Sequence, residues 1–208
     1  MTSTDASAAI RVAVLGEWVP SQLADVLALQ RAEEPETAAS LVESDTAGST
    51  NESVRDGFDF AVSPADLKWP GWVCEALWHD TLAVAVAKRS HLLVYREVPC
   101  HELLKQPIIS AQSSAEELWH AEVHRLFEDE PQAIEQTVGT FDMAMTLVAA
   151  GYGITIAPAT RLASYQSRGI TVRPLAGAPM VVMAYLLHPS AALTEPQERF
   201  ARRARSVS

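Results

Sequence analysis

The order of the apolar segments is the feature that most constrains the fold of this chain. Short β-branched segments alternate with amphipathic segments in the first third, and the alternation predicts strands at 11–16, 39–44 and 58–63 with helices at 22–34 and 49–57. Strands that alternate with helices form a parallel sheet with crossover helices. The sequence therefore predicts an α/β fold that begins near residue 10.

The alternation restarts after a break at 64–72, which is rich in turn residues. The second series predicts strands at 107–110, 133–139, 154–158 and 170–175, and helices at 114–129, 141–151 and 161–169. Two long strands, at 73–88 with a kink near His79 and Asp80 and at 180–189, flank the second series, and a terminal helix follows at 195–206.

This arrangement predicts two Rossmann-like lobes joined by two crossover strands. We expect lobe I to comprise residues 10–84 and 180–208, lobe II to comprise 85–179, and residues 1–9 to be a disordered leader. A cleft between the lobes is expected, because ligands of open α/β sheets bind outside the carboxyl ends of the strands.

Two glycines in the segment LVAAGYGITIAPAT, Gly151 and Gly153, raise the question of a phosphate-binding loop. A phosphate loop follows a strand and opens a helix, whereas this segment reads as a helix that leads into a strand. Gly151 fits the position after a helix end, where a positive φ costs glycine little. We therefore expect the glycines to allow close packing of a helix on a strand.

Composition and charge exclude several classes of function. Hydrophobic residues make up 48% of the chain and charged residues 20%, as in an ordinary globular protein. The formal net charge of -10 disfavours direct contact with nucleic acid or with an anionic membrane. No segment resembles a membrane span or a signal peptide, and Cys74 and Cys100 suggest neither a disulfide framework nor a zinc site. These features predict a cytoplasmic protein.

Four phrases, in order, resemble the effector-binding domain of LysR-type transcriptional regulators, which has the type 2 periplasmic-binding-protein fold. They are RVAVLGEWVPSQLADVLALQRAEEPE, DGFDFAVSP, LWHDTLAVAVAKRSHLL and LVAAGYGITIAP, and the resemblance runs from about Ile10 to Arg205. The family normally carries an N-terminal winged helix-turn-helix, which this sequence does not contain. The DNA-binding part is therefore expected to have been removed, or the chain is a free-standing sensor.

The resemblance implies a non-enzymatic domain that senses a small-molecule effector of unknown identity and responds by a conformational or assembly change. It implies no catalytic residues, no metal and no cofactor. The family pairs such domains side by side through the first helix and the second strand. We accordingly expect a homodimer and, in a free-standing form, a DNA-binding partner protein. The residues expected at the dimer interface are Leu23, Val26, Leu27 and Leu41.

The candidate ligand site is placed where predicted strands end and predicted helices begin. It comprises Glu17, Trp18, Ser63, Ser110, Gln112, Ser113, Thr140 and Phe141. Hydroxyls and backbone N–H groups at helix N-termini suit a polar or anionic group, and aromatic rings suit a planar apolar body. Ser114 and Thr140 are also expected to cap the helices that follow them. The family usually has small hydroxyl residues where this chain has Glu17 and Trp18, which argues against a simple carboxylate effector.

The sequence also allows other hypotheses about function. Trp18 could fill the cleft, which would make the chain a protein–protein interaction module without a ligand. The chain could also be a cytoplasmic solute-binding protein or a small enzyme on the same fold, and turnover of a ligand that is lost on changing Glu17 to Gln would favour the enzyme. His120 and His124 lie four residues apart, but a solvated helix face explains them better than a metal site. The terminal arginines, Arg199, Arg202, Arg203 and Arg205, are expected to complement the negative end of the last helix.

Overall fold

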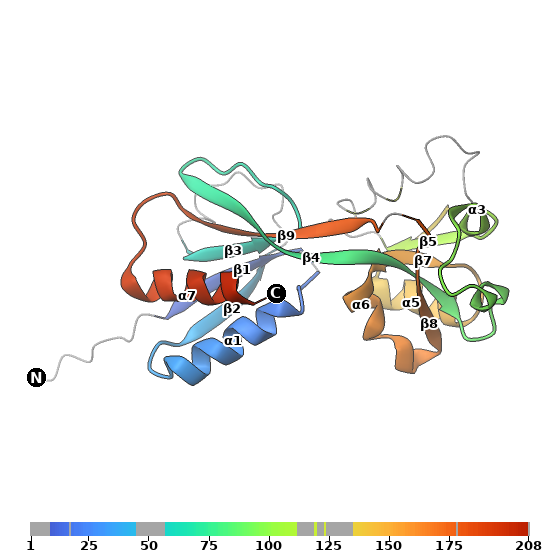
Figure 1. Cartoon of the computed structure of the whole chain (residues 1–208), viewed down its shortest axis with the longest axis horizontal. Helices are drawn as coiled ribbons and strands as arrows, with labels where there is room; N and C mark the ends of the chain where they lie inside the picture. Colours follow the sequence, from blue (N-terminus) through green and yellow to red (C-terminus); the bar gives the residue numbers. More distant parts are fainter. Residues whose placement is uncertain are drawn as a thin grey trace, which may run out of the picture. The chain divides into compact units, whose positions relative to one another are not determined.

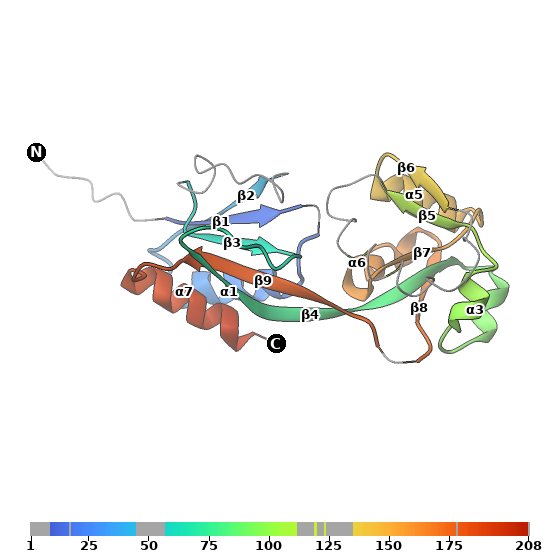
Figure 2. The same ribbon diagram turned by 90° about the horizontal axis from the view of Figure 1, so that it is seen from above.

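The computed structural model describes residues 9–16, 18–44, 57–111, 119, 123, 135–177 and 179–207. The chain forms two compact units, of which unit 1 is Met1–Trp78 with Met183–Ser208 and unit 2 is His79–Val182. The sequence had suggested divisions after residues 84 and 179. The divisions in the structure, after Trp78 and after Val182, fall inside the long strands β4 (Trp72–Ala87) and β9 (Val181–Pro189), so these strands contribute residues to both units (Figures 1 and 2). Because β4 continues as one strand through His79 and Asp80, the predicted kink does not interrupt it.

The sheet of unit 1 has the predicted parallel core. Its strand order is β2 (Ala39–Ser44), β1 (Ile10–Leu15), β3 (Phe60–Ser63), β9 and β4. β1 pairs in parallel with both β2 and β3, whereas β3 pairs antiparallel with β9. Helix α1 (Gln22–Glu33) makes the crossover from β1 to β2, and α7 (Glu195–Ser206) packs against α1 (Figure 1). The predicted helix at 49–57 lies almost wholly outside the described residues.

Aromatic side chains pack on the strands of unit 1. Trp69 is buried in a cluster with Ala13, Leu15, Ala61 and Leu187, and its ring meets that of Trp72 edge to face at 5.4 Å. Phe60 packs instead against Phe200 of α7, with ring centroids 4.9 Å apart. Because successive residues of a strand point to opposite faces, the alternation in β3 supplies both contacts. The segment 64–72, predicted only as a break, therefore contributes to the core.

Unit 2 contains the second series of elements. The second half of β4 pairs antiparallel with β7 (Thr155–Pro158) and β8 (Ile170–Pro174), and β5 (Ile108–Ala111) pairs in parallel with β6 (Glu135–Val138). The helices are α3 (Cys100–Leu103), α5 (Phe141–Ala149) and α6 (Ala159–Ala163), with 3-10 turns η1 (His91–Val94) and η2 (Gln166–Arg168). Of the predicted helix at 114–129, only Trp119 and Val123 are described, and both are helical and buried.

Two local predictions in unit 2 need correction. The single helix predicted at 161–169 is instead α6, which ends at Ala163, followed by the separate turn η2, which ends at Gly169 with a φ of 101°. α6 also begins earlier than predicted, directly after Pro158, because proline fixes the backbone that enters the first turn. The turn η1 was not predicted, since its sequence HLLV has no helical periodicity of useful length.

The glycine pair has the structural role that the sequence suggested. Gly151 follows the end of α5 with a φ of 86°, which a residue with a side chain rarely adopts. At Gly153 a Cβ atom would come within 2.3 Å of the Pro107 carbonyl oxygen and 3.1 Å of the Ile109 side chain. The loop after α5 therefore packs directly on the start of β5, and only glycine fits there.

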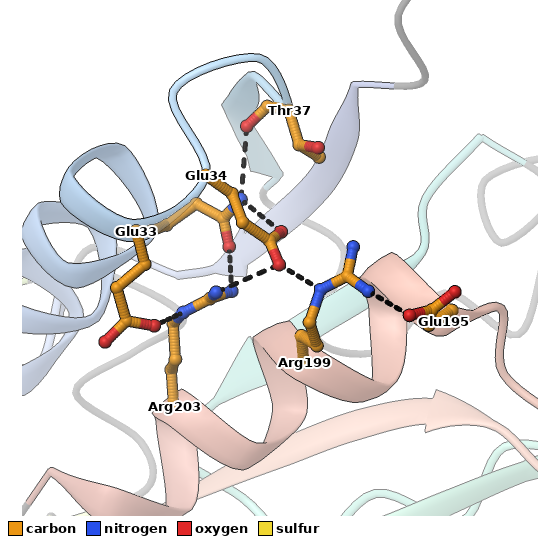
Figure 3. A network of polar contacts seen from close by, with 7 residues as sticks. Glu33, Glu34, Thr37, Glu195, Arg199 and Arg203 are labelled. Carbon is orange, nitrogen blue, oxygen red and sulfur yellow. Dashed lines mark hydrogen bonds and ion pairs between the residues drawn. The ribbon is translucent and has the colours of Figure 1, made fainter.

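A network of charged side chains joins α1 to α7 (Figure 3). Glu34, directly after α1, accepts hydrogen bonds from Arg199 and, at 3.1 Å, from Arg203. Arg203 also donates to Glu33 and to the side chain of Gln30, both at 2.7 Å. Arg199 also pairs with Glu195. These arginines therefore bind the carboxylates of another helix, which the expectation of a helix-end role did not include.

The charged groups at the centre of the network are buried, and their pKa values are shifted. The side chains of Glu34 and Arg203 are each only 9% exposed. Burial alone would raise the pKa of Glu34, but hydrogen bonds from Arg203, Arg199 and Gln30 outweigh it and hold the pKa below its usual range. The pKa of Arg203 is raised, because its carboxylate partners outweigh the opposing effect of burial. Both groups are therefore charged in the folded protein.

Candidate functional site

In unit 1, the candidate residues follow the carboxyl ends of parallel strands. β1 and β3 are in register from Val12 opposite Phe60 to Val14 opposite Val62, so Gly16 and Ser63 follow at the same edge of the sheet. Gly16 has a φ of 82°, and the chain turns there before Trp18. This is the edge at which open α/β sheets bind their ligands.

The two candidate side chains described in unit 1 are both buried. Trp18 is 3% exposed. Ser63 is fully buried, and its hydroxyl donates to the Ala65 carbonyl oxygen at 2.9 Å and accepts from the Ala65 N–H at 3.0 Å. The Ser63 hydroxyl thus stabilises the turn after β3. Glu17 lies outside the described residues.

In unit 2, the corresponding edge is formed by β5, β6 and the start of α5. Ser110 lies opposite Thr137 in the parallel pair, and β6 leads through Gly139 into Thr140. Thr140 caps α5 as predicted, since its Oγ1 accepts a hydrogen bond from the Met143 N–H at 3.2 Å. Ser110 is buried, and α5 packs on β5. A helix N-terminus thus lies at the carboxyl edge of a parallel pair, which is a favourable position for an anionic or polar group.

Phe141 carries a stacked cation that sequence reasoning missed. The Arg161 guanidinium lies over the Phe141 ring at 3.9 Å from its centroid, and over the Trp119 ring at 5.5 Å. Tyr165 packs edge to face on Phe141 at 5.4 Å. Cation–π contacts of this kind hold a guanidinium in place. No sequence signal marks Arg161, because its partners are distant in the chain.

Five further positions singled out in the sequence lie outside the described residues. Gln112, Ser113 and Ser114 follow β5 and lie outside the described residues, together with the capping box predicted at Ser114. His120 and His124 lie outside them as well. Within the described part of the chain, no group of three or more His, Cys, Asp or Glu side chains has the arrangement of a metal site. Likewise, no described helix is both long and apolar enough to cross a bilayer.

The residues predicted for a dimer interface separate into two groups. Leu23 and Val26 are buried in the core of unit 1, because α1 turns these side chains towards the sheet. They therefore serve the fold of the unit itself. Leu27 is only partly buried, and Leu41 is 46% exposed on β2, the outermost strand in the order of this sheet.

The family model for the LysR substrate binding domain matches residues 3–208, which is nearly the whole chain. The chain belongs to this family. The match confirms the family suggested by the sequence, and with it the type 2 periplasmic-binding-protein fold and a role in effector sensing among LysR regulators. No curated protein sequence matches this LysR substrate-binding domain.

Solved structures of other LysR-type proteins share its fold. The BenM effector-binding domain with its effector benzoate is 23% identical with a TM-score of 0.81, and the match covers 95% of this chain and 90% of that chain. The effector-binding domain of QuiR in complex with shikimate is 18% identical with a TM-score of 0.76, covering 97% of each chain. Full-length BenM E226K is 22% identical with a TM-score of 0.82, covering 99% of this chain and 68% of that chain.

Proposed function

We propose that this LysR substrate-binding domain binds a small planar effector with a polar head group and passes the binding event on as a change in conformation or assembly. The family match supports effector sensing, and the two similar domains above are described with benzoate and shikimate. The capped N-terminus of α5 beside Ser110 is the observation that supports the proposed ligand contacts in unit 2. We further propose that the domain senses its ligand without converting it.

The proposed contacts are divided by their chemistry. Ser110 and the Thr140 hydroxyl, with the first N–H groups of α5, are proposed to bind the polar head group. Phe141, on whose ring the Arg161 guanidinium stacks, is proposed to contact the planar body of the ligand. Gln112 and Ser113 are proposed as further polar contacts in unit 2, and Glu17, Trp18 and Ser63 are proposed as the ligand-binding residues of unit 1.

Ligand-induced thermal stabilisation tests this proposal. We would screen a panel of small planar carboxylates, benzoate and shikimate included, together with their neutral amides. A ligand at about 100 times its Kd stabilises the folded state by about 2.7 kcal/mol. For a chain of this size, that corresponds to a rise in Tm of roughly 5–10 °C.

Two variants of α5 make the test specific. Thr140→Val removes the proposed contact, and Thr146→Val removes a hydroxyl that donates to the Asp142 carbonyl within the same helix. The ligand-induced shift, measured against each variant's own ligand-free Tm, should disappear in the first variant and persist in the second. Equal shifts in both variants would show that the ligand binds elsewhere.

We also propose a homodimer that uses the face made by Leu27, Leu41 and the edge strand β2. An edge strand with an exposed leucine favours pairing with another surface. Leu41→Lys should shift the sedimentation equilibrium towards monomer. Val94→Lys places the same charge at a side chain that is 77% exposed in unit 2, and should leave the equilibrium unchanged. A dimer that survives Leu41→Lys would refute this interface.

A further inference from the structure

A depression of about 670 Å³ lies wholly within unit 2, away from the proposed effector contacts. Its wall is made by the loop after α5, by the end of β4 with the start of η1, and by the residues before β5. Thr140 and Phe141 lie at the first turn of α5, whereas the depression is at the last. The nine residues of α5 separate these ends by roughly 13 Å at 1.5 Å per residue.

The side chains around the depression are basic or neutral. Lys88, Arg89 and His91 come from one short segment, and no lining residue is acidic. Within the described part of the chain, neither Lys88 nor Arg89 forms an ion pair with a carboxylate. Such a concentration of unpaired positive charge is notable on a chain with a net charge of -10. It creates a local field that attracts anions against the overall field of the protein.

The backbone makes the wall of the depression rigid. The Lys88 N–H donates to the Gly169 carbonyl at 3.2 Å, and the Ile154 N–H donates to the Pro107 carbonyl at 2.9 Å. Gly153 is in direct contact with Pro107, where no side chain would fit. These bonds fix the start of the basic segment to Gly169, and the glycine loop to the residues before β5. A preformed wall lowers the entropic cost of holding a ligand.

The end of α5 does not cancel this positive charge. A helix C-terminus carries about half a negative charge on its last carbonyl groups. Here the Leu147 and Val148 carbonyls already accept bonds from the Tyr152 and Gly151 N–H groups, at 3.1 and 2.9 Å. Lys88 and Arg89 each carry a full charge, so the balance at the depression is positive.

We propose that this depression is a second ligand site, which binds a compact anion with two or more negative charges, such as a phosphate ester or a polycarboxylate. The Arg89 guanidinium has the fork geometry that binds two oxygens of such a group, and the Lys88 ammonium adds a mobile point charge. His91 supplies a further ring N–H donor. The volume lies in the range of small-molecule sites. The site is separate from the effector contacts proposed above and does not depend on them.

Titration of the whole chain with inorganic pyrophosphate and, separately, with citrate tests this site at about 0.15 M salt. The amide signals of Gly151, Gly153 and Gly169, which line the depression, report binding by NMR, and calorimetry reports the affinity. We expect saturable binding of one anion, with the largest signal changes at these glycines. Binding of pyrophosphate alone would identify a phosphate site, and binding of both anions a general polyanion site.

A pair of charge-matched variants decides the assignment. Lys88→Ala/Arg89→Ala should weaken binding at least tenfold. Arg96→Ala/Arg202→Ala removes the same charge from exposed positions outside the depression and should change affinity less than twofold. All four side chains are exposed, so both variants should keep the Tm of the parent. The proposal would be overturned by equal weakening in the two variants, by signal changes elsewhere in the chain, or by binding that does not saturate. Binding of an acidic peptide in place of both small anions would also overturn it.

Discussion

Replacing Glu34 by glutamine should destabilise unit 1 more than any comparable change at an exposed ion pair. Glutamine keeps the shape of the side chain and one acceptor oxygen, but it removes the charge that Arg199 and Arg203 share. Charge-assisted hydrogen bonds contribute about 1.5–3 kcal/mol each, and breaking a buried pair costs about 3–5 kcal/mol.

The contacts in the structure indicate that the free-energy cost of this substitution is smaller than the cost of breaking a buried pair. Arg203 would still bond Glu33 and Gln30, and Arg199 would still bond Glu195, so neither arginine would be left without a partner. We therefore expect a loss of roughly 2–3 kcal/mol in the free energy of unfolding. At about 2–4 °C per kcal/mol, the Tm should fall by roughly 4–12 °C.

Glu75→Gln is the matched control, since Glu75 pairs with Arg205 where the side chains are 28% and 48% exposed. Exposed pairs contribute at most about 1 kcal/mol. Urea unfolding followed by circular dichroism gives both values at neutral pH. If Glu34→Gln costs no more than Glu75→Gln, the cost of removing the buried charges from water cancels their attraction, and the reasoning about the network is wrong.

Three further predictions concern pH, close packing and helix capping. The pKa of Glu34 is lower in the folded state than its usual 4.5, so its contribution to the free energy of unfolding should be complete above that pH and disappear as the pH falls further. Urea unfolding at a series of pH values should show this loss in the parent and not in Glu34→Gln. Gly153→Ala should cost at least about 2 kcal/mol through its clash with the Pro107 carbonyl, whereas Gly139→Ala, with no atom within 4 Å of the added Cβ, should be nearly neutral by the same measurement. Thr140→Ala should cost about 1 kcal/mol by removing the cap of α5, and Thr140→Ser should restore it; a loss that serine fails to restore would contradict the capping role.

Local periodicity was sufficient to predict most elements of the fold. The strands β1, β2 and β8 and the helices α1 and α7 lie within about one residue of the positions predicted from hydrophobic pattern and from Gly and Pro signals. The exceptions were short elements such as η1, and the division of one predicted helix into α6 and η2. A turn or two of helix has too few residues for a periodic signal.

Contacts between distant segments could not be predicted from local patterns in the sequence. Glu34 and Arg199 are separated by 165 positions, and the basic segment at Lys88 lies about sixty positions before the glycine loop with which it lines the depression. The cap at Thr140 was predictable because its partner is three residues away. Arg161 on Phe141 was not, since no local pattern distinguishes a stacked arginine from a solvated one. The candidate site was thus predictable where it depends on helix termini.

Because β4 and β9 connect the two units, they also affect the order in which the units can fold during translation. Unit 2 is one uninterrupted stretch, whereas unit 1 requires residues from both ends of the chain. During translation, unit 2 can acquire all of its residues while Glu34 still lacks both arginine partners, which arrive only with α7. The order of synthesis therefore allows unit 2 to fold first, and unit 1 can be completed only after α7 has been synthesised.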